Sequence, residues 1–149
     1  MYERVLLTLD TSEFAERAIP HAVAISKAFG ARLCILGVVP VLDDLGADPL
    51  ALKIDWDAEV AHTEEYLSGV QQALKADGVE AEVELRRGNV TEEILLFSTK
   101  LDADLIIMST HGRSGLGRWV YGSVADRVLR YADCPVLLVR AAEEPDEQD

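Results

Sequence analysis

The sequence has few of the features that disulfide-stabilised or membrane-spanning proteins need. It contains two cysteines, Cys34 and Cys134, which are far apart and lack the spacing of a metal site. We therefore expect buried thiols in a reducing compartment rather than a disulfide or a redox pair. No apolar run approaches the roughly 20 residues that span a bilayer, and the first residues do not read as a secretory signal. These absences predict a cytoplasmic protein with no membrane partner.

Positive charge is also scarce. Lysine and arginine together number 14 against 27 aspartates and glutamates, which gives a net charge of −13. Because proteins that bind nucleic acid draw affinity from clustered basic side chains, we predict no nucleic-acid partner. A small phosphate ligand is not excluded, since backbone N–H groups can hold it. The 149 residues, 49% of them hydrophobic, fit one globular domain.

Strand and helix patterns alternate along the chain. Four segments are apolar on both faces, as expected of strands covered by helices on both sides: 5–9, 33–39, 105–108 and 136–139. A fifth, residues 79–85, alternates polar with apolar and is predicted at a sheet edge. Helical spacing of apolar residues fills the gaps at about 15–29, 60–74, 90–101 and 123–131. Residues 1–141 are therefore predicted to form one α/β domain, a doubly wound parallel sheet with helices on both faces.

Two segments stand outside this pattern. Residues 40–56 are rich in proline, glycine and aspartate and predict a long loop after the second strand. A lid over a ligand and a tolerated insertion are both open interpretations of this loop. Residues 142–149 form an acidic tail that we predict to be disordered.

A glycine-rich segment follows the fourth strand. Gly112, Gly115 and Gly117 fall within six residues, and Gly122 with Ser123 opens the last helix. Glycine lets a ligand approach the backbone closely, and a helix start offers unpaired N–H groups with a partial positive charge. The segment therefore predicts a phosphate cradle. An ordinary turn followed by a helix cap at Ser123 remains the alternative.

Asp10 ends the first predicted strand. It either caps the first helix or, if the first and fourth strands are neighbours, faces the glycine-rich segment where the strand order reverses. A carboxylate in that place suits a ribose hydroxyl or an adenine amino group. The P-loop and the dinucleotide-binding motif are both absent. His111 has no positioned partners that would make a catalytic triad.

The sequence resembles the universal stress protein family over nearly its whole length. The resemblance rests on Val5–Asp10, Gly88-Asn89-Val90, Thr110–Gly115 and the closing Cys134–Val139. Nucleotide-binding members carry G-x2-G-x9-G-[ST]. Gly112, Gly122 and Ser123 match this pattern here, and Ser109 replaces its first glycine.

The resemblance implies a sheet of order 3-2-1-4-5 and an ATP site. Ser123 could contact a Mg²⁺ ion bound with the nucleotide. The resemblance also implies that Asp10 contacts ribose or adenine and that Val38 meets the adenine through its backbone. The full predicted nucleotide-binding set is Thr8, Asp10, Val38, Met108, Ser109, Gly112, Arg113, Gly122, Ser123 and Val124. The resemblance further implies a homodimer joined through Val136–Val139, because an apolar edge strand needs a cover.

Three functions follow from these patterns. The favoured one is an ATP-binding stress-response or regulatory protein whose conformation depends on the nucleotide and is recognised by an unknown protein partner. The first alternative is an interaction protein of the same fold that binds no nucleotide. The second is a slow ATPase, for which the sequence offers no general base, so we predict no catalytic residue.

Overall fold

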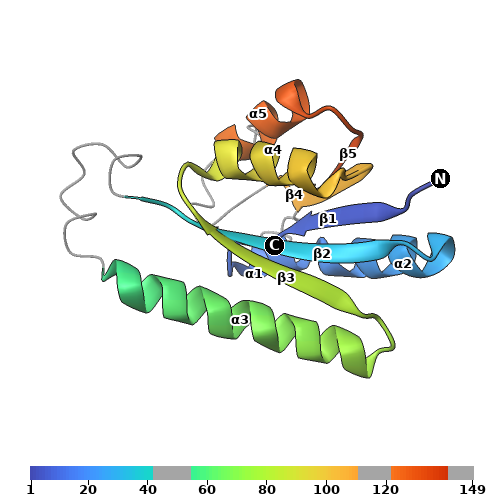
Figure 1. Cartoon of the computed structure of the whole chain (residues 1–149), viewed down its shortest axis with the longest axis horizontal. Coiled ribbons are helices and arrows are strands. Elements are labelled where there is room, and N and C mark those ends of the chain that lie inside the picture. The colour runs from blue at the N-terminus through green and yellow to red at the C-terminus, as the bar shows by residue number, and fades with distance from the viewer. Residues whose placement is uncertain (42–54, 111–121, 141–149) are drawn as a thin grey trace, which may run out of the picture.

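The computed structural model describes residues 1–41, 55–110 and 122–140. Its elements are β1 (Arg4–Thr8), α1 (Glu13–Glu16), α2 (Ile19–Phe29), β2 (Arg32–Val39), α3 (Trp56–Ala76), β3 (Ala81–Arg87), α4 (Val90–Leu101), β4 (Leu105–Ser109), α5 (Ser123–Tyr131) and β5 (Val136–Val139) (Figure 1). Most of the predicted loop, Gly112, Arg113 and the acidic tail lie outside these ranges. Within them, no helix has the length and apolar character that a membrane span requires.

The five strands form one parallel sheet of order β3-β2-β1-β4-β5. This confirms the predicted order and places the alternating strand β3 at an edge. Leu7 of β1 pairs with Ile35 of β2 on one side and with Ile107 of β4 on the other. The strand order therefore reverses beside β1, and the carboxyl ends of β1, β2 and β4 lie together.

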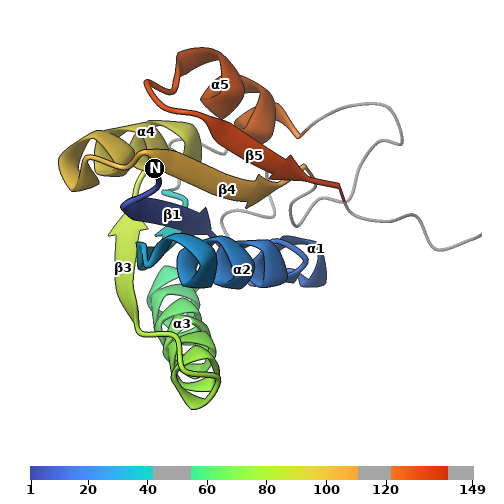
Figure 2. The ribbon, with the colours of Figure 1, turned by 90° about the vertical axis from the view of Figure 1, so that its right-hand side faces the viewer.

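Two apolar layers cover the sheet, one on each face. On one face α1, α2 and α3 pack against the side chains of Val5, Leu7, Leu33 and Ile35. On the other face α4 and α5 pack against Leu6, Cys34, Leu36, Ile106 and Met108. Figure 2 shows the two groups of helices on opposite sides of the strands. Helices cover both faces, as the apolar strands predicted.

The first helical segment differs from its prediction. One apolar stripe from Ala15 to Phe29 predicted a single helix, whereas the structure has α1 and α2 with Arg17 and Ala18 between them. Pro20 lies in the first turn of α2, where its missing N–H is tolerated as it would not be in a helix interior. The stripe continues across the break because Ala15, Ala18 and Ala22 all pack in the same layer.

Side-chain caps set the starts of two other helices. The Asp55 carboxylate accepts a hydrogen bond from the Ala58 N–H at 3.1 Å, so α3 begins at Trp56, earlier than the apolar pattern predicted. Asn89 accepts from the Glu92 N–H at 3.0 Å, and α4 begins at Val90 as predicted.

Helix α3 approaches the sheet closely at Gly37 of β2. A Cβ atom at Gly37 would lie 2.8 Å from Cδ1 of Leu67 and 3.1 Å from Cγ2 of Thr63. Leu67 is fully buried and Thr63 is 5% exposed, so neither side chain has free space to move into. Because Gly37 has no side chain, α3 can pack this close to β2. This packing also places Thr63 near the carboxyl end of β2.

Both cysteines are free thiols, in agreement with the sequence analysis. Cys34 is 3% exposed, and burial raises its pKa to about 11, with smaller contributions from the charges of Glu82 and Glu84. Cys134 is half-buried, and burial raises its pKa as well. Both side chains are therefore neutral thiols at neutral pH and poor nucleophiles.

Candidate functional site

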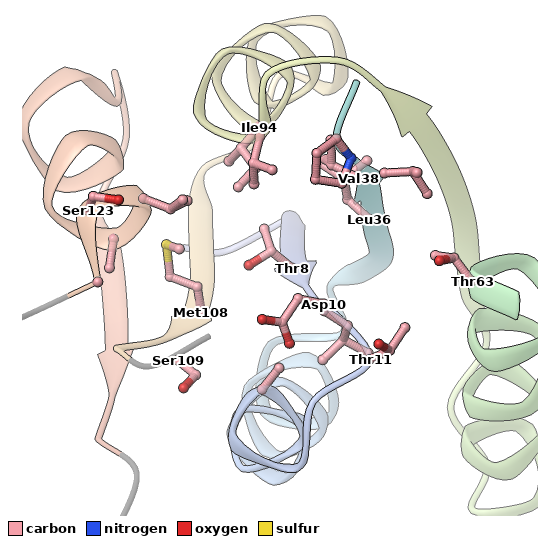
Figure 3. Close-up of a pocket in the computed structure, with 18 of the residues that line it drawn as sticks. Thr8, Asp10, Thr11, Leu36, Val38, Thr63, Ile94, Met108, Ser109 and Ser123 are labelled. Atoms are coloured by element: carbon pink, nitrogen blue, oxygen red, sulfur yellow. The ribbon is translucent and has the colours of Figure 1, made fainter. Parts of the chain in front are cut away.

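A cavity of about 290 Å³ lies at the carboxyl ends of β1, β2 and β4. Part of its lining comes from the face covered by α4 and α5, including Met108 and Ile94, and part from the α3 side, including Thr11 and Thr63 (Figure 3). The cavity therefore extends over the edge of the sheet at the point where the strand order reverses. Open parallel sheets bind their ligands at this position.

Asp10 follows β1 and lies near the middle of the cavity. One carboxylate oxygen accepts hydrogen bonds from the N–H and the hydroxyl of Ser12. Ser12, and not Asp10, caps α1, because its hydroxyl oxygen accepts from the Ala15 N–H at 3.1 Å. The alternative role of Asp10 as the helix cap is therefore wrong. Figure 3 shows the carboxylate inside the cavity, between Thr8 and Ser109.

Thr11 has an unusual backbone conformation, with φ at 69°. This left-handed region favours glycine and is disfavoured for a β-branched residue. Strain of this kind costs about 1–3 kcal/mol and concentrates at functional sites. The hydrogen bonds between Asp10 and Ser12 span Thr11 and hold the turn. The fold thus keeps a threonine side chain on the cavity wall at an energetic cost.

The first turn of α5 forms one end of the cavity. Gly122 is the N-cap residue: its carbonyl accepts from the Asp126 N–H at 3.0 Å, and its own N–H donates to the Thr110 carbonyl at 2.8 Å. Ser123 is therefore the first helical residue, and its alternative role as the cap is wrong. Among the described residues, no side chain caps this helix start. The N–H groups of its first turn, with the positive end of the helix dipole, suit an anion.

Position 122 favours glycine because a side chain has little space there, and not because of the backbone angles. Its φ of −49° and ψ of 148° are open to any residue. A Cβ atom there would lie 3.2 Å from the Thr110 carbonyl oxygen, which is tighter than ordinary contact. A side chain at this position would crowd that carbonyl, which also accepts the hydrogen bond from the Gly122 N–H.

Most of the residues predicted from the sequence lie together in this cavity: Thr8, Asp10, Val38, Met108, Ser109, Gly122, Ser123 and Val124. Gly112 and Arg113 lie outside the described residues. The roles of all ten in binding stay predictions. In the described part of the chain, no group of three or more His, Cys, Asp or Glu side chains could hold a metal ion. The contact between Ser123 and Mg²⁺ likewise stays a prediction.

The sequence analysis missed several residues of the lining, among them Thr11, Glu59, Thr63, Val90 and Ile94. Glu59 and Thr63 are four positions apart, which is the spacing of one helix face. Nothing in the sequence shows, however, that this face of α3 lies at the carboxyl end of β2. Val90 and Ile94 have the same spacing on α4, and the sequence analysis gave them no role in binding.

Comparisons of the sequence and of the structure with known proteins find the same family. The model of the universal stress protein family matches residues 1–140. A universal stress protein of Methanocaldococcus jannaschii is 35% identical over 144 residues, covering 94% of this chain and 83% of the relative. The solved structure of a universal stress protein from Lactobacillus plantarum has a TM-score of 0.81 at 26% identity, covering 93% of this chain and 98% of the other.

A further solved structure has the same fold at lower identity. It is the universal stress protein from Archaeoglobus fulgidus in complex with dAMP, with a TM-score of 0.67 at 20% identity. The likeness covers 92% of this chain and 97% of that protein.

Proposed function

Since the chain belongs to the universal stress protein family, we propose that it binds ATP in the cavity at the carboxyl ends of β1, β2 and β4 and acts in the stress response. Nucleotide occupancy sets a conformation that a protein partner recognises. The place of action is the cytoplasm, where the two free thiols stay reduced. The observation that carries the proposal is the start of α5, which no side chain of the described residues caps and which opens into a cavity that also contains the Asp10 carboxylate.

The cavity supports this assignment because the chemical character of its lining changes from the start of α5 to the apolar residues of β2 and β4. Ser123 and Val124 provide a helix start for phosphate groups. Asp10 provides a carboxylate that can accept from ribose hydroxyls. Val38 and Met108 provide apolar surface for a planar base. A protein of this fold has been solved with dAMP, which is also an adenine nucleotide.

Calorimetric titration of the nucleotide-free protein with ATP and Mg²⁺ tests the proposal, with GTP for comparison. We expect saturable binding of ATP. In the variant Gly122→Val the affinity should fall at least tenfold, because the added side chain crowds the Thr110 carbonyl and relief of this contact should shift the start of α5. The matched control is Gly69→Ala, since a Cβ at Gly69 meets nothing within 4 Å. This control should bind ATP as the unaltered protein does.

Two outcomes would contradict the proposal. One is an absence of binding up to about 1 mM ATP, a limit near −4 kcal/mol, both by calorimetry and by a second probe that does not depend on enthalpy. The other is ATP binding that Gly122→Val leaves unchanged. The first outcome would favour an interaction protein that binds no nucleotide, and the second would place the nucleotide elsewhere.

The proposal includes a homodimer joined through β5. This strand is an edge of the sheet, and its sequence Val136–Val139 is entirely apolar. Val136, Leu137 and Leu138 are only partly buried in the single chain. An apolar edge with unpaired backbone groups favours pairing with a second strand. We expect equilibrium sedimentation at micromolar concentration to give twice the chain mass of 16.3 kDa. A monomer under these conditions would contradict the dimer.

A further inference from the structure

Helix α1 lies between the cavity and α3. Ala15 of α1 lines the cavity, as do Asp10 and Thr11 in the turn before it. The last residue of α1, Glu16, contacts α3 instead: its carboxylate oxygen accepts a hydrogen bond from the Tyr66 hydroxyl at 2.8 Å. The two helices pack in the same layer, on one face of the sheet (Figure 2). Helix α1 therefore joins the cavity to a contact between two helices outside the cavity lining.

The helical hydrogen-bond pattern is interrupted between α1 and α2. Helix α1 is a single turn of four residues. Pro20 has no N–H to donate to the Glu16 carbonyl four positions earlier, which is the bond that would continue the helix. Before α1, Thr11 has the strained left-handed backbone described above. A single helical turn is marginal by itself, so α1 depends on its contacts with the rest of the protein.

Side-chain hydrogen bonds hold α1 at both ends. At its start the Ser12 hydroxyl oxygen accepts from the Ala15 N–H at 3.1 Å. Ser12 in turn donates its N–H and its hydroxyl proton to the Asp10 carboxylate, which lies in the cavity. At its end Glu16 accepts from Tyr66. Hydrogen bonds therefore connect a carboxylate of the cavity to α3 by way of α1.

The Tyr66 hydroxyl keeps its proton at neutral pH. Burial raises the pKa of Tyr66 above its ordinary value, and the hydrogen bond to Glu16 and the charges of Glu16 and Asp10 raise it further. The Tyr66 side chain is partly buried and packs against the core layer that contains Ala15. The packed side chain loses little further rotamer freedom when its hydroxyl donates to Glu16. Tyr66 is therefore a fixed donor on α3, and α1 is called docked here when Glu16 accepts from it.

From this arrangement we infer that α1 is a switch element, which docks on α3 through the Glu16–Tyr66 hydrogen bond and stays docked while a ligand fills the cavity. The inference rests on the proposed ATP site and names the element that carries nucleotide occupancy to the protein surface. A ligand that needs Asp10 and Ala15 in their docked positions binds the docked state alone, so its binding suppresses the undocked state. A partner protein that contacts α1 and α3 together distinguishes the two states.

Amide hydrogen exchange without nucleotide tests the docking contact. The N–H groups of Arg17 and Ala18 donate to carbonyls of α1 at 3.3 and 3.0 Å, so their exchange reports the opening of α1. In Tyr66→Phe this exchange should be about fivefold faster, as expected for the loss of one stabilising hydrogen bond. The matched control is Tyr131→Phe, which removes the hydroxyl of a 68% exposed tyrosine on α5, across the sheet. This control should leave the exchange at Arg17 and Ala18 unchanged.

Variants of Glu16 test the same contact from α1. Glu16→Gln keeps an oxygen that accepts from the Tyr66 hydroxyl, so its α1 exchange should stay within about twofold of the unaltered protein. Glu16→Ala should match Tyr66→Phe, and the double variant should be no faster than either, because both substitutions remove the same bond. Unchanged exchange in Glu16→Ala and Tyr66→Phe, or effects that multiply in the double variant, would overturn the docking contact.

Repeating the exchange with ATP tests the link to the cavity. If ATP binds only the docked state, ATP at about nine times its Kd should slow the exchange of Arg17 and Ala18 about tenfold, since protection grows as one plus the ratio of free ligand to Kd. Tyr66→Phe should show the same factor at nine times its own Kd. The reference is the Gly78 amide, which donates to the Lys75 carbonyl after α3 and should keep its rate.

The outcomes separate this inference from the proposed function. If calorimetry shows ATP binding but the exchange of α1 is unchanged by ATP, the switch is overturned and the ATP site stands. If ATP does not bind, the proposed function fails and its coupling to α1 fails with it. The nucleotide-free variants then still decide whether α1 docks through Tyr66.

Discussion

Asp10→Asn is expected to weaken ATP binding by 10- to 100-fold without unfolding the protein. Hydrogen bonds to a charged acceptor contribute about 1.5–3 kcal/mol each, and asparagine loses the charge and one acceptor oxygen. The fold should survive because asparagine retains the oxygen that accepts from the N–H and hydroxyl of Ser12. Calorimetry measures the affinity, and urea unfolding checks that stability is preserved.

The control ligand for this prediction is 2′,3′-dideoxy-ATP, which lacks the ribose hydroxyls. If Asp10 accepts from these hydroxyls, the unaltered protein and the Asp10→Asn variant should bind the dideoxy compound equally. A carboxylate that acted only through its negative charge would affect ATP and the dideoxy compound alike. Unchanged ATP affinity in Asp10→Asn would contradict the role of this side chain.

Leu67→Ala is expected to lower the free energy of unfolding by about 2–5 kcal/mol, since Leu67 is fully buried between α3 and the sheet. Gly37→Ala should lower it by about 1–3 kcal/mol, because the added methyl group would lie 2.8 Å from Cδ1 of Leu67. Combining the two substitutions should cost less than the sum of the single ones. The shortened side chain at position 67 leaves room for the methyl group at position 37.

Urea unfolding of the two single variants and the double variant measures this coupling, which we expect to be about 1 kcal/mol or more. Leu74→Ala is the matched control, since Leu74 is buried on the same helix but is not among the atoms nearest to Gly37. Its effect should add to that of Gly37→Ala. Full additivity for Leu67 would show that the close approach at Gly37 does not limit the packing of α3.

The sequence allowed the fold to be predicted because its strands carry distinct burial patterns. Apolar residues on both faces marked β1, β2 and β4 as covered strands, and alternation marked β3 as an edge. The break between α1 and α2 was missed because the apolar stripe continues across it. Periodicity reports which face is buried, but it does not report whether the backbone hydrogen bonds are continuous.

The candidate site was predictable only where the chain carries a local signal. Asp10 at a strand end and Gly122 at a helix start are visible in the sequence. Thr63 was missed because its place in the cavity lining depends on how closely α3 approaches β2, and the absence of a side chain at Gly37 allows that approach. Thr11 was missed because its conformation is set by the hydrogen bonds of its neighbours and not by its own preference.

The strands that line the cavity are the central strands of the sheet. Among the described residues, neither β3 nor β5 contributes to it. Strands at sheet edges open transiently at lower free energy than central ones, because fewer contacts hold them. Opening of β5 would reach the cavity, because the Val139 carbonyl accepts a hydrogen bond at 3.0 Å from the N–H of Thr110, which lines the cavity. The second chain that we propose on β5 would hold this hydrogen bond in place, and with it one wall of the cavity.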